Sequence, residues 1–163
     1  MYTYHYNSPL GGITLASNGN ELTGLWFDGQ RYFCDTHSLE TEEKYLPIFG
    51  QTILWLDIYF SGKVPNFTPP LALLTTPFRK LVWNIMRTIP YGKTMTYGQI
   101  AQMVANQKGI LNMSAQAVGN AVGHNAIALI IPCHRVIGAC GKLTGYAGGI
   151  DKKEALLRLE KIL

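Results

Sequence analysis

Residues 131–137 read Ile131-Pro132-Cys133-His134-Arg135-Val136-Ile137 and place one cysteine beside one histidine at the end of an apolar run. Cysteine attacks as the thiolate, so a nucleophilic site has to lower the pKa of its thiol through an imidazole, a cation or a helix N-terminus. His134 and Arg135 are two such candidates. A free cysteine is also commonly a small buried hydrophobe, and the heptapeptide alone leaves that alternative open.

Helical patterns precede the heptapeptide. One helix is expected over residues 77–89, because Thr76 can cap it, proline occupies its first turn and its apolar side chains form one stripe. Thr96-Tyr97-Gly98-Gln99 has the form of a capping box that opens a second helix to about residue 105, and Ser114 can cap a third to about residue 123. Two short helices joined by a turn suggest a helix-turn-helix.

A final helix is expected after a further capping-box pattern at residues 151–154, with an inner side formed by Ala155, Leu156, Leu159, Ile162 and Leu163. Glu160 lies four residues after Leu156 and three before Leu163, so its carboxylate shares a side with apolar residues. A carboxylate at that edge requires a partner. We expect His134 to be the partner, and the alternatives are a lysine such as Lys161 or solvent.

The N-terminal part of the sequence has the pattern of β-strands, in contrast to the helical patterns of the C-terminal part. Residues 2–6, 13–17 and 21–27 carry β-branched and aromatic side chains, and Asn18-Gly19 is a hairpin signal, so an antiparallel sheet is expected. Residues 47–60 have helical spacing, and Ser61-Gly62 can end that helix.

Prolines concentrate between residues 64 and 77, which favours a stiff connector. We therefore expect an α+β protein with an N-terminal domain over residues 1–70 and a mostly helical C-terminal domain over residues 71–163.

Length and composition limit the classes of protein to which the chain can belong. A chain of 163 residues with 47% hydrophobic content can bury a core without a disulfide or a metal. Three cysteines, Cys34, Cys133 and Cys140, form no disulfide framework, and the N-terminus lacks a signal-peptide pattern, so we expect the reducing cytoplasm. The longest apolar run, residues 126–131, is too short to cross a bilayer, and no membrane partner is expected.

Charge is distributed unevenly along the chain. Residues 1–75 hold three Lys and Arg against seven Asp and Glu, a balance of −4, whereas residues 76–163 hold eleven against three, a balance of +8. Clustered cations displace the counterions of nucleic-acid phosphates, so the C-terminal half is expected to meet a polyanion. A basic surface with no partner is the alternative.

The heptapeptide and its surroundings resemble the O6-alkylguanine-DNA alkyltransferases, also called methylated-DNA–protein-cysteine methyltransferases. The resemblance covers about residues 76–160. It is carried by the following motifs: Ile130 to Ile137, Thr76-Pro77-Phe78 with Val82-Trp83, Ile89-Pro90-Tyr91-Gly92-Lys93-Thr94, Thr96-Tyr97-Gly98-Gln99-Ile100-Ala101, Gly145-Tyr146-Ala147-Gly148-Gly149 and Lys153-Glu154-Ala155-Leu156-Leu157.

The resemblance implies a ribonuclease H-like N-terminal domain and a winged-helix-like, DNA-binding C-terminal domain. It also implies that the protein transfers the alkyl group of O6-alkylguanine, and possibly of O4-alkylthymine, irreversibly to Cys133, once per molecule. His134 would be the base for the thiol through a water molecule, Glu160 would orient the imidazole, and Tyr97 would help to protonate the leaving guanine.

Further site residues follow from the same resemblance. Substrate binding is implied for Asn125, Val136, Tyr146, Ala147 and Gly148. Contacts with the minor groove of double-stranded DNA are implied for Tyr97, Ser114, Ala115, Gln116, Ala117, Gly119 and Arg135, with residues 114–123 as the recognition helix. The protein would act as a monomer without a cofactor or metal.

The chain departs from its family at two positions. Gln116 occupies the position that usually holds an arginine, inserted where the flipped base was, so we expect weaker DNA engagement or a different balance of base recognition. Asn125 is followed by Ala126 where the family usually has proline, so the loop ahead of Cys133 is expected to be braced by Asn125 but less rigid.

Three other functions are considered. A non-catalytic sensor of alkylated bases would share the fold but lack the reactive cysteine, and Cys133 is present. A cysteine hydrolase would need an oxyanion hole, and nothing specifies its acyl substrate. A zinc site is disfavoured, because Cys133 and Cys140 are widely spaced and Cys34 with His37 lacks a second pair. The role of Cys140 stays open between packing and sensitivity to oxidation.

Overall fold

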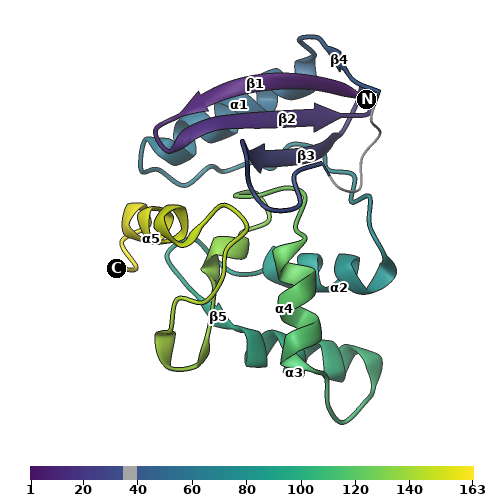
Figure 1. Cartoon of the computed structure of the whole chain (residues 1–163), viewed down its shortest axis with the longest axis vertical. Coiled ribbons are helices and arrows are strands. Elements are labelled where there is room, and N and C mark those ends of the chain that lie inside the picture. The colour runs from purple at the N-terminus through teal and green to yellow at the C-terminus, as the bar shows by residue number, and fades with distance from the viewer. Residues whose placement is uncertain (35–39) are drawn as a thin grey trace. The chain divides into compact units, whose positions relative to one another are not determined.

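A computed structural model describes residues 1–34 and 40–163, which form two compact units (Figure 1). Unit 1 consists of Met1–Leu74 and Ala126–Ala128, and unit 2 consists of Thr75–Asn125 and Leu129–Leu163. The proline-containing connector therefore carries the chain from one unit to the next. The segment 126–128 belongs to unit 1 although the sequence places it among the residues of unit 2. His37, named above with Cys34 as a weak zinc candidate, lies outside the described residues.

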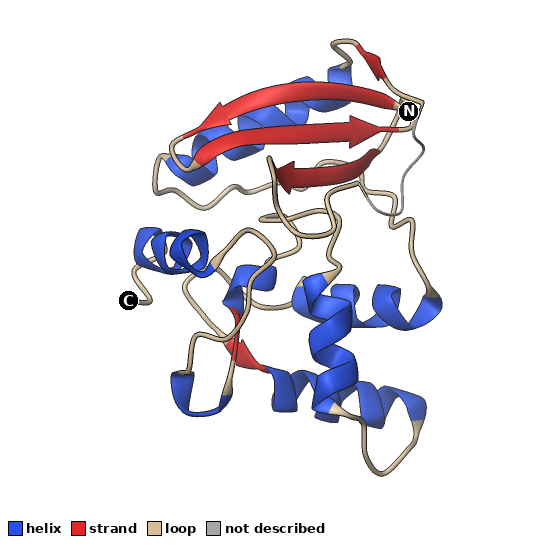
Figure 2. Cartoon of the chain, viewed as in Figure 1, coloured by secondary structure: helices blue, strands red, loops and turns tan. Residues whose placement is uncertain are grey.

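Unit 1 is an α+β unit built on one sheet (Figure 2). Strands β1 (Tyr2–Ser8), β2 (Gly11–Ser17), β3 (Leu22–Phe27) and the short β4 (Glu42–Glu43) lie in the order β3-β2-β1-β4. The first three pair antiparallel as predicted, and β4 pairs parallel to β1. The sequence did not indicate β4, because two adjacent, exposed glutamates have low β propensity.

Local chemistry explains the turn between β2 and β3. The side-chain oxygen of Asn18 accepts hydrogen bonds from the backbone N–H groups of Asn20 and Glu21, and Gly19 adopts a φ of 115° that favours glycine. Helix α1 (Pro47–Phe60) has the predicted bounds and packs against β1, β2 and β3. Residues 126–128 run beside β3, where Leu25 donates to the carbonyl of Ala126 over 2.8 Å and accepts from Ala128 over 2.9 Å.

Unit 2, all of whose residues are described, is mostly helical. It contains α2 (Pro77–Met86), α3 (Tyr97–Lys108), α4 (Ala115–Gly123) and α5 (Ile150–Leu159), with the single-turn helices η1 (Cys133–Arg135) and η2 (Ala139–Gly141). Strand β5 (Met95–Thr96) pairs parallel with β6 (Val136–Ile137). This pairing joins the start of α3 to the residues that follow η1.

The predicted caps at the starts of α3 and α4 are confirmed. Thr96 accepts a hydrogen bond from the backbone N–H of Gln99, whose side chain accepts in turn from the N–H of Thr96. Ser114 accepts from the N–H of Ala117 over 3.2 Å. Helix α4 also packs on α2, because Nε1 of the buried Trp83 donates to the carbonyl of Ala121 over 2.8 Å. The Trp83 hydrogen bond joins α2 to α4, and α3 packs against both helices.

Helix ends differ from the sequence-based expectation in two places. Helix α2 ends at Met86 instead of Ile89, because Pro90 disfavours helical geometry before it and the N–H groups of Thr88 and Ile89 close tighter turns to the carbonyls three residues back. Helix α3 continues to Lys108, where Gly109 ends it in the left-handed conformation.

The expectation for the final helix is partly wrong. Helix α5 begins after Gly149, which has a φ of 99°, and no side chain caps it, so the capping box expected at residues 151–154 is absent. Leu156 and Leu157 are buried, whereas Leu163 is 53% exposed. The helix ends at Leu159 and Lys161 adopts a positive φ, which carries the last residues away from the helical register. Within the described residues, no helix combines the length and the apolar character that a bilayer span requires.

Candidate active site

Cys133 opens η1 directly after Pro132. Its backbone N–H donates to the carbonyl oxygen of Ile131 over 2.8 Å, and Nδ2 of Asn125 donates to the same oxygen over 2.7 Å. Asn125 is buried, and this hydrogen bond gives its side-chain amide a partner within the protein. The brace that the sequence led us to expect ahead of Cys133 is therefore present, with Ala126 in place of proline.

Burial dominates the protonation state of the Cys133 thiol. The residue is 6% exposed, and burial raises the pKa of the thiol above its ordinary value. A hydrogen bond with Asn125, the charge of Lys153 and a hydrogen bond with Tyr146 lower the pKa without outweighing burial. Burial therefore has the largest effect on the thiol pKa, and the neighbouring charge and hydrogen bonds act in the opposite direction.

His134 and Glu160 form a fully buried pair, with 2.5 Å between Nε2 and Oε2, so the contact expected from the sequence is present. Burial lowers the pKa of His134 more than the carboxylate raises it. Burial alone would raise the pKa of Glu160, but hydrogen bonds from His134, Arg135 and the N–H of Gly92 lower it to about 2. A neutral imidazole that faces a carboxylate carries its proton on Nε2, which leaves Nδ1 as the nitrogen able to accept one.

Arg135 completes the Glu160 cluster. Its Nε lies 2.8 Å from Oε1 of Glu160, its Nη2 lies 3.3 Å from Oε2, and its Nη1 donates to the carbonyl of Ile89 over 2.9 Å. The guanidinium also lies 5.6 Å from the ring centre of Tyr91, and the residue is only 8% exposed. The geometry gives no support to Arg135 as a DNA contact, because its donors are directed into unit 2.

Tyr97, the first residue of α3, lies between the thiol and α4. Burial raises the pKa of its hydroxyl, a hydrogen bond with Thr144 lowers it and the charge of a Cys133 thiolate raises it, so the hydroxyl stays protonated at neutral pH. The ring of Tyr97 faces α4, because a Cβ added to Gly119 would lie 3.8 Å from it. Tyr97 thus connects the Cys133 thiol with the expected recognition helix.

The expected substrate loop follows η2. Tyr146, Ala147 and Gly148 are half-buried, and the N–H of Gly149 donates to the carbonyl of Tyr146 over 2.9 Å to close a turn. Tyr146 lies near enough to Cys133 to lower the pKa of its thiol. Val136, the other expected substrate residue, has a fully buried side chain.

Helix α4 has one buried and one exposed side. Val118, Ala121 and Val122 are buried. The residues expected to meet DNA lie elsewhere on the helix and are exposed or half-exposed: Ser114, Ala115, Gln116, Ala117 and Gly119. Their roles stay predictions.

One residue of the site was missed by the sequence analysis. Lys153 is fully buried in α5, and its charge acts on the Cys133 thiol. A signal was available, because Lys153 precedes Leu156 by three residues and Glu160 by seven, which places it on the side of the helix already assigned to Glu160.

Comparisons with known proteins show which family the chain belongs to. Residues 77–162 match the family model described as 6-O-methylguanine DNA methyltransferase, DNA binding domain, and residues 1–73 match that of its ribonuclease-like domain. The chain belongs to the 6-O-methylguanine DNA methyltransferase family. The family resemblance and the α+β fold inferred from the sequence are thereby confirmed.

Relatives of this methyltransferase family match the chain over most of its length. Methylated-DNA–protein-cysteine methyltransferases of Mycobacterium bovis and Methanosarcina acetivorans are 45% and 44% identical over 161 residues, which cover 96% and 98% of this chain and 92% and 98% of theirs. A crystal structure of Mycobacterium tuberculosis OGT in complex with DNA superposes with a TM-score of 0.84 at 44% identity, and the match covers 99% of this chain and 93% of that one.

Proposed function

We propose that this chain repairs O6-alkylguanine in DNA by transferring the alkyl group irreversibly to Sγ of Cys133, once per molecule. The observation that carries the proposal is the buried row of Cys133, His134 and Glu160 within the region that matches the family's DNA-binding domain. The names of relatives that are more than 40% identical over nearly the whole chain support the same reaction.

The chemical step is an in-line displacement. The thiol proton moves to Nδ1 of His134 through a water molecule, and the sulfur forms a bond to the alkyl carbon while the bond from that carbon to guanine O6 breaks. The bonding electrons leave on guanine, which takes a proton from the Tyr97 hydroxyl. The imidazolium proton returns to the solvent and the tyrosinate regains one, so thiol and O6-alkylguanine become thioether and guanine. Water does not readily cleave a thioether, and each molecule is therefore spent after one transfer.

Proton transfer to His134 depends on Glu160. Before substrate binds, burial favours the neutral thiol and the neutral imidazole alike. An imidazolium that forms beside the Glu160 carboxylate is stabilised by a short, charge-assisted hydrogen bond. Glu160 thus supports the charged state that the reaction needs, and general-base assistance of this kind contributes roughly 10²–10⁴-fold to a rate.

Substrate and DNA would be held by separate groups of side chains. Asn125, Val136, Tyr146, Ala147 and Gly148 would frame a guanine turned out of the duplex. The exposed side of α4 would lie in the minor groove, with contacts from Tyr97, Ser114, Ala115, Gln116, Ala117 and Gly119. The DNA complex of the Mycobacterium tuberculosis relative supports DNA binding, and we propose that one copy of the chain acts alone.

A non-catalytic lesion sensor is the second candidate, because the same fold could bind a flipped base without reacting. The two functions are separated by intact-mass analysis after the protein is mixed with a duplex that contains one O6-methylguanine. We expect one methyl group on the wild type, mapped to Cys133, and none on Cys133→Ser.

Cys140→Ser is the matched control, since Cys140 is an exposed thiol and its loss is expected to leave methylation intact. Methyl transfer to another residue, or repeated repair by one molecule, would contradict the proposal. Tight lesion binding with no added mass would favour the sensor.

A further inference from the structure

The loop that joins α3 to α4 carries an apolar side chain that the core does not use. Leu111 is 90% exposed, the largest exposed fraction among the large apolar residues at positions 1–34 and 40–163, and the neighbouring Ile110 is 44% exposed. The loop projects from unit 2 beyond the ends of both helices (Figure 1). Leu111 thus contributes almost nothing to the packing of unit 2, and its apolar surface is available to a partner.

Both ends of this loop are held by hydrogen bonds. Helix α3 ends at Gly109 in the left-handed conformation, and the N–H of Ile110 donates to the carbonyl of Ala105 over 3.0 Å, which is the Schellman pattern. At the other end, the side chain of Ser114 caps α4. Leu111 therefore lies on a short loop between two fixed helix ends, so its side chain is presented at a defined place relative to α4.

That place is close to the start of the expected recognition helix. Three residues lead from Leu111 to Ser114, and three residues span at most roughly 11 Å. Successive base pairs of a duplex are about 3.4 Å apart. If the start of α4 lies in the minor groove, Leu111 is within about three base pairs of the exposed Gln116 side chain.

The charges around the loop favour a nucleic acid over a protein as its partner. Between Asp57 and Asp151 the sequence contains no Asp or Glu, and the exposed Lys108 directly precedes the loop. Protein surfaces ordinarily carry charges of both signs. A long stretch with cations and no carboxylates is suited to the phosphates of DNA, which repel carboxylates and attract lysine.

An apolar side chain has a known use in the minor groove. Proteins that bind this groove insert leucine, isoleucine, methionine or phenylalanine between base pairs and partly unstack them. Burial of the side chain against the bases offsets part of the cost of that unstacking. Turning a base out of the duplex requires unstacking as well. Gln116 brings no charge to this task, whereas Leu111 brings apolar surface to the same few base pairs.

We propose that Leu111 is an apolar wedge that enters the minor groove beside the lesion and opens a base step while α4 occupies the groove. This inference deepens the proposed function and rests on it for the placement of α4. A second copy of the chain is the other occupant that an exposed leucine could meet, and the experiment below separates the two.

The first test measures affinity against salt. Fluorescence anisotropy with a labelled duplex that contains one O6-methylguanine is recorded for wild type, Leu111→Ala, Leu111→Met and Leu54→Ala. Leu54 is the matched control, because it is a 54% exposed leucine on α1 of unit 1. We expect Leu111→Ala to weaken binding by about tenfold with the slope of log affinity against log salt unchanged, because an apolar contact releases no counterions.

The other variants define the outcome. Leu111→Met keeps an apolar side chain and is expected to retain most of the affinity, whereas Leu54→Ala is expected to bind like the wild type. Leu111→Ala should also unfold at the wild-type temperature, since its side chain is exposed. Unchanged affinity in Leu111→Ala, or a slope that becomes shallower by about one as for a lost cation, would overturn the proposal.

A second test asks whether a base step opens. The fluorescent base 2-aminopurine is placed in turn at each of the three base pairs on either side of the lesion, because it brightens when it is unstacked. With protein at saturation, we expect the wild type to raise the fluorescence at one position and Leu111→Ala to lose that increase. A loss of affinity with unchanged fluorescence would overturn the wedge. A change in self-association without DNA, measured by analytical ultracentrifugation, with unchanged DNA affinity would assign Leu111 to a second copy instead.

Repair assays separate this proposal from the proposed function. Intact mass is followed over time with the lesion in a duplex and in a single strand, which has no paired step to open. Leu111→Ala is expected to lose more rate on the duplex than on the single strand, and an equal loss on both would overturn the wedge. A wild type that binds the duplex and gains no methyl group would refute the proposed alkyl transfer, while the affinity and fluorescence results would still decide the role of Leu111.

Discussion

Glu160 receives hydrogen bonds from three residues in two segments of unit 2. His134 and Arg135 belong to η1, whereas the N–H of Gly92 comes from the turn ahead of β5. Both carboxylate oxygens thereby accept hydrogen bonds from the protein. A buried anion requires such hydrogen bonds, because water does not reach it. The same contacts keep Glu160 ionised, and an ionised Glu160 is the group that can stabilise a protonated His134.

Glu160→Gln is expected to weaken both stability and repair. Removing one member of a buried ion pair leaves the Arg135 charge uncompensated, at a cost of about 3 kcal/mol in urea unfolding at neutral pH. Methyl transfer is expected to slow by about 100-fold, because the imidazolium loses its counter-charge. Glu154→Gln is the matched control in the same helix: its pair with Arg158 is exposed, so its effect is expected to stay below about 1 kcal/mol.

Stability measured against pH in the acid range is a second test of the same variant. The folded-state pKa of Glu160 is lowered from 4.5 to about 2. The ionised carboxylate therefore stabilises the folded protein above pH 4.5, and this contribution to the free energy of unfolding is lost as the pH falls toward 2. The stability difference between wild type and Glu160→Gln should therefore shrink over that range. A difference that stays constant with pH would contradict the assigned ionisation.

Helix α4 uses small residues in two ways. On its inner side, Val118, Ala121 and Val122 are buried, whereas the half-exposed Gly119 lies beside the ring of Tyr97. On its outer side, Ala115 and Gln116 are exposed at the start of the helix. A neutral outer side offers shape and hydrogen bonds to a groove but little electrostatic attraction, so the affinity of this helix for DNA should be limited by charge.

Gln116→Arg is expected to strengthen DNA binding. An added cation that meets a phosphate or the groove makes the slope of log affinity against log salt steeper by about one, as fluorescence anisotropy with a labelled duplex can measure. Asn120→Arg is the matched control, because Asn120 is exposed one turn later on the same helix. Equal gains from both substitutions would show a general charge effect, and no gain from Gln116→Arg would refute the expected importance of that position.

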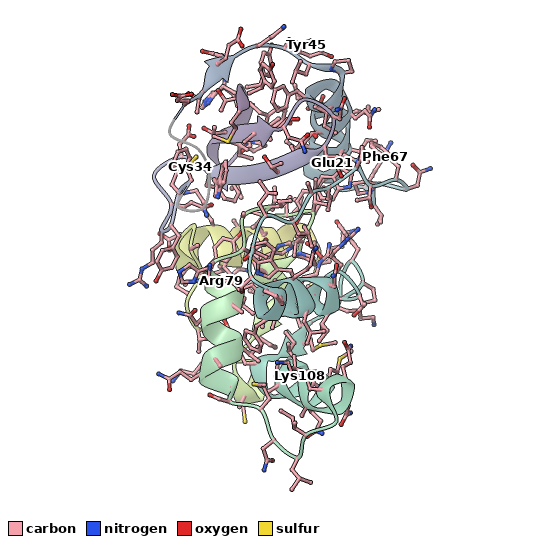
Figure 3. All side chains as sticks on the ribbon, turned by 90° about the vertical axis from the view of Figure 1, so that its right-hand side faces the viewer. Glu21, Cys34, Tyr45, Phe67, Arg79 and Lys108 are labelled. Carbon is pink, nitrogen blue, oxygen red and sulfur yellow. The ribbon has the colours of Figure 1, made fainter. Side chains whose placement is uncertain are left out.

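Folding buries some of the charged side chains of the basic C-terminal half and leaves the others at the surface. Of the eleven Lys and Arg residues in positions 76–163, Arg135 and Lys153 are buried, and the other nine are exposed or half-exposed. The nine include Arg79 on α2 and Lys108 at the end of α3 (Figure 3). Lys108 also lies 5.3 Å from the ring centre of Phe78. Unit 2 therefore keeps a basic surface, and its two buried cations belong to the site.

Lys108→Gln is expected to reduce the salt dependence of DNA binding, because Lys108 precedes the turn that leads into α4. The slope of log affinity against log salt should become shallower by about one, with a similar loss of affinity for damaged and undamaged duplexes. Lys63→Gln removes an exposed lysine from unit 1 and should leave the slope unchanged. An equal effect of both substitutions would refute a local contact of Lys108 with DNA.

Much of the fold could be predicted because its signals are local. The bounds of α1, the antiparallel order of β1 to β3 and the caps Thr96 and Ser114 follow from side-chain spacing and from hydrogen bonds within a few residues. The early end of α2 and the uncapped start of α5 were missed, because one depends on a proline beyond the helix and the other on a glycine with positive φ. Strands β5 and β6 have two residues each, too few for a periodic pattern.

The sequence by itself determined the longer helices and strands, the candidate nucleophile and the family, because these depend on residue types at fixed spacing along the chain. It also indicated that Glu160 would meet His134. Only the tertiary structure decided that Arg135 turns to Glu160, that Lys153 is buried beside the thiol and that the thiol pKa is raised. These properties depend on desolvation and on charges brought together from distant segments, which no local pattern contains.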